Sequence, residues 1–115
     1  MLQIVSFRLA RILRNLGMPQ EDGIYYTPSR KKVLERPKNG YFAPKQEEVL
    51  SWFREKGFHV FTKVSKGGWS YFVYSLKEQR YCVRGAKSPL YQGYNKCLEA
   101  AIYYVIRFCQ IREFV

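Results

Sequence analysis

One stretch of the chain, residues 58–76, constrains the fold more than any other. It reads FHVFTKVS, then KGG, then WSYFVYSL. Both outer runs are rich in β-branched and aromatic residues, which favour strands, and the glycines between them can supply the positive φ of a tight turn. The stretch therefore predicts an antiparallel β-hairpin. A turn on Gly67 and Gly68 predicts a register in which Val64 faces Tyr71.

Helical patterns flank this hairpin, and a third strand follows it. Residues 44–56 and 91–112 carry apolar side chains at i, i+3 and i+4 spacing, and Gly57 ends the first of these segments. RYCVR at 80–84 predicts a shorter third strand. The apolar stripes are Val49, Trp52 and Phe53 in the first helix and Tyr94, Leu98, Ala101, Ile102, Val105, Ile106 and Cys109 in the second.

These elements predict an α+β fold. Residues 44–115 form a two-layer α-β-β-(β)-α unit, in which both helices cover one face of a small antiparallel sheet. Residues 1–17 add an N-terminal amphipathic helix, although their opening, LQIVSFRL, also suits a strand. This helix docks on the core, forms a dimer contact or lies on a membrane surface. Residues 18–43 have no sustained period and predict a basic irregular linker or arm, with IYY at 24–26 as a candidate short strand.

The net charge of the chain favours some classes of binding partner over others. Its 115 residues include 20 Lys and Arg against 9 Asp and Glu, a net charge of +11. Such an excess favours nucleic acid, an anionic membrane surface or an acidic protein, although some soluble proteins are simply basic. Three cysteines without a C-x-x-C pair argue against a disulfide framework and fit a reducing cytoplasm. No run of about 18 apolar residues predicts a membrane span.

The alternation along the hairpin gives the sheet two faces. Exposed rings among positive charges are typical of surfaces that bind single-stranded nucleic acid, so the face that also holds His59 and Lys63 is the candidate interface. The alternative is that residues 24–26, the N-terminal helix or a second subunit in a homodimer covers this face. We assign Phe58, Val60, Val64, Tyr71 and Val73 to the core, and Phe61, Phe72 and Tyr74 to the candidate interface beside Lys63, with Phe61 opposite Tyr74.

The segment 18–43 supplies a second group of candidates. Its five central cations stand against a single acidic neighbour, Glu35, and would displace counterions from phosphates without reading sequence. The alternative is a solvated basic loop. The cations are Arg30, Lys31, Lys32, Arg36 and Lys38.

The sequence offers no catalytic or metal-binding pattern. His59 is the single histidine and has no Cys, His or Asp cluster near it in the sequence. The carboxylates show no pairing suited to acid–base catalysis, and the P-loop, dinucleotide and H-E-x-x-H motifs do not occur. We therefore expect a protein that is not an enzyme and uses no cofactor or metal.

Several short motifs carry a resemblance to known proteins. Residues 41–106 contain FAP, WFRE, SY, SLKE and LEAAI in that order. This pattern resembles a family of small uncharacterised proteins from phages and mobile elements of Bacteroidetes, which implies provenance but no site residues. The order helix, three strands, helix also resembles double-stranded-RNA-binding domains. The lysine cluster that starts the final helix in those domains is reduced here to Lys87 and Lys96.

The function expected from these features is weak nucleic-acid binding with low sequence specificity by a non-catalytic accessory protein. The alternative is a protein-interaction module, such as an inhibitor or an assembly partner, that docks on an acidic protein.

Overall fold

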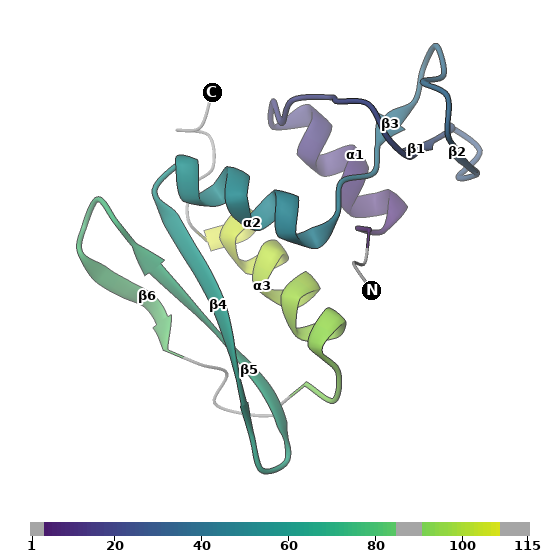
Figure 1. Ribbon diagram of the computed structural model, residues 1–115. Helices are drawn as coiled ribbons and strands as arrows, with labels where there is room; N and C mark the ends of the chain where they lie inside the picture. Colours follow the sequence, from purple (N-terminus) through teal and green to yellow (C-terminus); the bar gives the residue numbers. More distant parts are fainter. Residues whose placement is uncertain (1–3, 85–90, 109–115) are drawn as a thin grey trace. The chain divides into compact units, whose positions relative to one another are not determined.

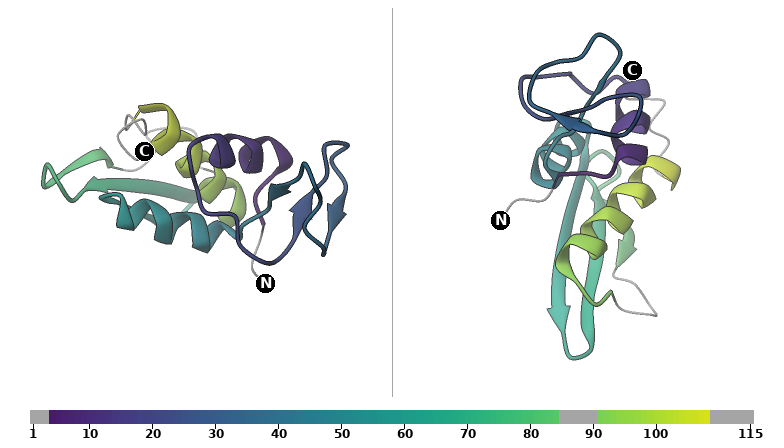
Figure 2. Two further views of the ribbon diagram at one scale, coloured as in Figure 1. Left: turned by 90° about the horizontal axis from the view of Figure 1, so that it is seen from above. Right: turned by 90° about the vertical axis from the view of Figure 1, so that its right-hand side faces the viewer.

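The computed structural model describes residues 4–84 and 91–108. The chain divides into two compact units, one reaching to Glu48 and the other spanning Val49–Ile111, and each is described by itself (Figures 1 and 2). The described residues form three helices and two three-stranded antiparallel sheets, which confirms the α+β class. Cys109 and Lys87 lie outside the described residues.

The larger unit contains the predicted hairpin and both flanking helices. α2 (Gln46–Glu55), which begins just before the boundary, leads into β4 (Phe58–Ser65), β5 (Gly68–Ser75) and β6 (Arg80–Arg84), and α3 (Tyr94–Phe108) follows. The strand order is β4-β5-β6. α3 runs beside the hairpin and contacts β4 and β5 (Figure 1).

The predicted register of the hairpin is wrong by two residues. Ser65 pairs with Gly68, so the loop contains two residues, and Gly67 supplies its positive φ of 103°. Val64 consequently faces Trp69, two residues before the predicted partner. Because side chains alternate with a period of two, this displacement leaves every side chain on its predicted face.

The core of the larger unit follows the predicted stripes, with two corrections: Tyr94 of the α3 stripe is 40% exposed, and Val64 of β4 is not buried. Val60 and Val73 are buried, whereas Phe58 and Tyr71 are only partly so. Val64 is 59% exposed, so its assignment to the core is wrong: it lies near the tip of the hairpin, which extends past α3 (Figure 1). The helices bury Val49, Leu50, Trp52 and Phe53 from α2 and Cys97, Leu98, Ala101, Ile102 and Val105 from α3.

The smaller unit is a folded helix-and-sheet module. α1 (Phe7–Asn15) packs on β3 (Tyr41–Phe42), and β1 (Tyr25–Tyr26) lies between β3 and β2 (Lys32–Val33). Residues 18–43 therefore hold a sheet, not the predicted irregular linker. The candidate short strand at 24–26 is present as β1, whereas β2 and β3 were missed because two residues are too few to show a period.

The N-terminal helix starts later than predicted. Ser6 caps it, since the Leu9 N–H donates to the Ser6 Oγ at 3.3 Å. Before the cap, Ile4 forms a bridge with Lys45, which agrees with the strand alternative for the opening segment. At the other end Gly17 has φ 93° and stops the helix as expected.

Side chains also bond the segments of the smaller unit to one another. The Tyr26 hydroxyl donates to the Val5 carbonyl at 2.8 Å, and the Tyr25 hydroxyl donates to the Glu21 carbonyl at 2.6 Å. The Phe42 N–H donates to the Gln20 Oε1 at 2.9 Å. Buried Leu9 and Leu13 of α1 complete the packing.

Candidate nucleic-acid interface

The face of β4-β5-β6 opposite α3 carries a continuous group of aromatic side chains. We call it the open face. Three of its rings, the predicted Phe61, Phe72 and Tyr74, are partly buried, and Tyr81 is 38% exposed. The aromatic and charged residues of the open face are His59, Phe61, Lys63, Phe72, Tyr74, Tyr81 and Arg84.

The rings of the open face touch one another across all three strands. Phe61 pairs with Phe72 rather than with the predicted Tyr74, and their rings stack at 4.9 Å between centroids with planes 4° apart. Tyr81 meets the Tyr74 ring edge-on at 5.1 Å, and the His59 ring lies 5.4 Å from Phe61. Each of these rings is therefore held by its neighbours, which limits the freedom lost when a ligand binds.

A β-bulge places the last cation on this face. Tyr81 pairs with Tyr74 and Arg84 pairs with Phe72, so one extra residue, Cys82, stands between the two pairs. The bulge brings Tyr81 and Arg84 to the same side, and the Arg84 guanidinium lies 5.1 Å from the Tyr81 ring centroid. Both residues were missed, because strict alternation separates positions 81 and 84.

The bulge is also supported from the helix. The Tyr104 hydroxyl of α3 donates to the Cys82 carbonyl at 3.1 Å. The extra residue of the bulge is therefore bonded to the helix on the other side of the sheet.

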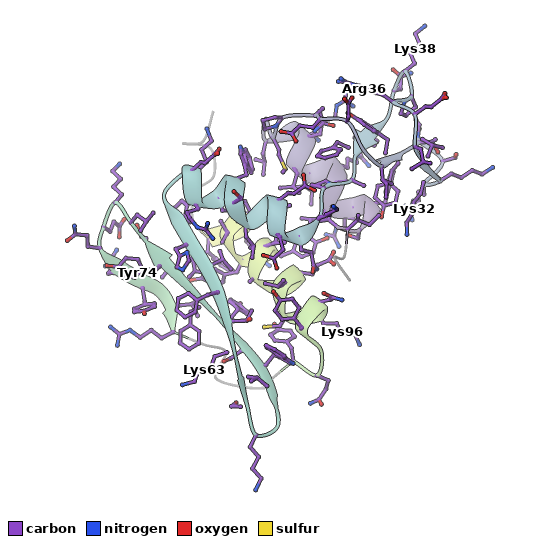
Figure 3. The ribbon with its side chains drawn as sticks, viewed as in Figure 1. Lys32, Arg36, Lys38, Lys63, Tyr74 and Lys96 are labelled. Atoms are coloured by element: carbon purple, nitrogen blue, oxygen red, sulfur yellow. The ribbon has the colours of Figure 1, made fainter. Side chains whose placement is uncertain are left out.

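The charges of the open face are positive. Lys63 and Arg84 are exposed, and no ion pair to either occurs among the described residues. Arg80, which lies in β6 with Arg84, does pair with Glu78. Figure 3 shows Tyr74 and Lys63 projecting from the same side of the hairpin, away from Lys96 on α3. The open face therefore combines ring surfaces with unpaired cations.

The covered face differs in its chemistry. Tyr71 there contacts the rings of Tyr91 and Tyr104 at 6.1 and 5.9 Å. Burial first, and then these two neighbouring tyrosines, raise the pKa of Tyr71. Its hydroxyl therefore stays protonated well above neutral pH, as suits a side chain packed against a helix.

The predicted basic residues of 18–43 belong to the smaller unit. All five are exposed: Arg30 and Lys31 lie in the turn after β1, Lys32 in β2, and Arg36 and Lys38 before β3. Figure 3 shows Lys32, Arg36 and Lys38 projecting in different directions, so these three do not form one patch. The candidate residues thus belong to two units of the chain.

Comparisons with known proteins found no matching protein-family model, curated protein or solved structure. Within residues 4–84 and 91–108, no three His, Cys, Asp or Glu side chains form a group that could hold a metal ion. In the same part of the chain, no helix has the length and apolar character needed to cross a membrane.

Proposed function

We propose that the protein binds single-stranded nucleic acid with low sequence specificity through the open face. The observation that supports this most is the group of contacting rings on three strands with Lys63 and Arg84 beside it. Bases stack on such rings for about 1–3 kcal/mol each, and cations nearby release counterions from the phosphates. The net charge of +11 favours the same class of partner.

Low specificity follows from the side chains present. Discrimination between bases relies on bidentate Asn, Gln, Arg or carboxylate contacts to base edges. Of these residue types, only Arg84 occurs among the seven aromatic and charged residues of the open face. Its rings accept any base, because every base has a π-face.

A second candidate, an acidic protein partner, is favoured by one observation. Phe61 and Phe72 stack on each other, so each already uses one ring face and offers mainly its edge and its other face. A protein partner could bury those edges, and its carboxylates could meet Lys63 and Arg84. A second copy of this chain is less suitable, because face-to-face pairing would bring like charges together.

The test is binding of fluorescent single-stranded oligothymidylate, oligouridylate and a duplex across a salt series. Lys63→Gln with Arg84→Gln should weaken single-strand binding and reduce the salt slope by about 1.4, or about 0.7 for each lost phosphate contact. The control is Lys56→Gln with Lys77→Gln, which removes the same charge from exposed positions outside the open face.

Two results would overturn the proposal. One is absence of binding at low salt. The other is equal behaviour of the two double variants, which would reduce the effect to net charge. A stoichiometric complex with an acidic protein that survives nuclease treatment and is lost on Lys63→Gln with Arg84→Gln would favour the second candidate.

A further inference from the structure

The smaller unit contains a row in which two adjacent rings are flanked by two arginines. The Arg14 guanidinium lies 5.1 Å from the centroid of the Tyr41 ring, and the Arg30 guanidinium lies 5.2 Å from that of Phe7. Phe7 and Tyr41 meet at 5.7 Å with planes 89° apart. We call Arg14, Tyr41, Phe7 and Arg30 the arginine–aromatic row.

Three separate elements build this row. Phe7 opens α1 and Arg14 lies in its last turn, while Tyr41 comes from β3. The Phe7 ring is fixed from a second side by Tyr26, which it meets edge-on at 5.6 Å. The row is therefore part of the packed unit.

Arg30 occupies its place at a conformational cost. Its φ is 70°, in the left-handed region that costs a non-glycine residue about 1 kcal/mol or more. The turn that imposes this φ is closed by two hydrogen bonds, from the Arg30 N–H to the Thr27 carbonyl at 2.9 Å and from the Thr27 N–H to the Lys31 carbonyl at 2.8 Å. Glycine or asparagine would suit this backbone conformation better. We therefore attribute the presence of arginine at position 30 to its guanidinium group.

The chemistry of the row suits nucleotides. Both guanidinium groups belong to exposed residues, and neither has an ion pair in the described part of the chain. A ring beneath a guanidinium restricts its rotamers while leaving its outer face for a base and its N–H edge for a phosphate. An acidic peptide would use the N–H edge but not the planar face, so the geometry favours nucleic acid.

The charge distribution supports two sites more than one. Residues 1–48 hold nine Lys and Arg against five Asp and Glu, and residues 49–111 hold ten against three. Each unit thus has its own positive excess, and each combines it with a planar surface on which bases can stack: the rings of the open face in one, and the ring-supported guanidiniums in the other.

We infer that the arginine–aromatic row is a second single-stranded nucleic-acid site, so that one chain binds two separate strand segments. The inference extends the proposed function of the open face but depends on different residues in a different unit. It does not depend on how the two units are arranged, because each segment is bound within one unit.

The test is the number of short oligonucleotides bound by the full-length chain. Native mass spectrometry and calorimetry with oligothymidylate of about six nucleotides at low salt should give two per chain. Arg14→Gln with Arg30→Gln should give one, and so should Lys63→Gln with Arg84→Gln. The control Arg11→Gln with Arg54→Gln, which removes equal charge from exposed positions, should still give two. Circular dichroism would verify that every variant is folded.

The outcomes separate this inference from the proposed function. One oligonucleotide per chain that is unaffected by Arg14→Gln with Arg30→Gln would overturn the second site and leave the open face standing. Binding lost in that variant but kept in Lys63→Gln with Arg84→Gln would support the row as a site and overturn the open face. Displacement of the row's oligonucleotide by short polyglutamate at equal charge concentration would overturn nucleic acid as its ligand and indicate an acidic protein.

Discussion

The sheet β4-β5-β6 and the sheet β2-β1-β3 each contain three antiparallel strands, but they differ in length and in what holds them. Two strands of the first have eight residues, and every strand of the second has two. The long sheet is joined by eight consecutive residue pairs between β4 and β5. The short sheet relies on tyrosine hydroxyls and the Gln20 amide, which bond to the backbone of its neighbours.

This difference shows that strands too short to be stable through their own ladder can still be specified. In the long sheet, backbone pairing and burial of alternate residues carry the stability. In the short sheet, the Tyr25 and Tyr26 rings have two roles, because each packs against a neighbouring ring while its hydroxyl donates to a carbonyl. Substitutions should therefore act on the two sheets by different mechanisms.

The largest expected effect concerns a matched pair of valines in the long sheet. Val73→Ala should lower the free energy of unfolding by about 2–3 kcal/mol, because a fully buried side chain loses its packing and leaves a cavity. Val64→Ala, 59% exposed, should cost less than about 0.5 kcal/mol. Urea unfolding followed by tryptophan fluorescence reports on this unit, since Trp52 and Trp69 both belong to it. Equal losses would contradict the assignment of Val64 to the surface.

A smaller loss of stability is expected in the short sheet when the hydroxyl group of Tyr26 is removed. Tyr26→Phe keeps the ring but removes the donor to the Val5 carbonyl, which should cost about 1–3 kcal/mol. Hydrogen exchange of peptides within residues 4–45 measures the change in this unit. Tyr41→Phe is the control, because no hydrogen bond of its hydroxyl occurs among the described residues, and it should change little. If both variants behave alike, hydroxyl bonding does not hold this sheet.

The next effect is local to α1. Ser6→Ala removes the acceptor for the Leu9 N–H and should destabilise the helix by about 1 kcal/mol. Ser6→Asp keeps an acceptor and adds a negative charge at the helix N-terminus, so it should retain full protection. Amide exchange across Phe7–Asn15 is the measurement. Faster exchange in Ser6→Asp as well would show that the cap does not depend on the side-chain oxygen.

The last effect, which is absent at neutral pH, is a pH dependence from the covered side of the long sheet. Burial raises the pKa of the Cys97 thiol from 9.0 to about 11. The folded state then holds this proton more tightly than the unfolded state, so the contribution of Cys97 is complete below pH 9 and declines between pH 9 and 11. Cys97→Ala should flatten the fall in stability over that interval. Exposed Cys82 should be alkylated at pH 8 while Cys97 is not, as peptide mass spectrometry would show. An unchanged slope in Cys97→Ala would assign the pH dependence to other groups.

The features predicted correctly from the sequence are those that depend on a periodic spacing of residues. The hairpin, the stripes of α2 and α3 and the two faces of the long sheet depend on repeated spacing, and these predictions hold. The register was wrong because either glycine of a pair can occupy the turn, and Gly68 belongs to the strand. Val64 was misplaced because periodicity gives the face of a residue but not the length of the helix that covers that face.

The candidate sites were predicted only in part. Phe61, Lys63, Phe72 and Tyr74 share a face as expected, since the error in register preserved their alternation. The row formed by Arg14, Tyr41 and Phe7 with Arg30 was not foreseen, because its members come from three distant segments and from strands of two residues. No local pattern brings such residues together; only packing of α1 on β3 does so.

The bulge at Cys82 makes β6 a strand with a change of phase. Before Cys82 the odd-numbered residues of the strand face the open side, and after it the even-numbered residues do. Deleting Cys82 would remove the extra residue and leave Val83 and Arg84 opposite Val73 and Phe72, on their present faces. A regular strand that kept Cys82 would instead turn Arg84 to the side of α3 and Val83 to the open face.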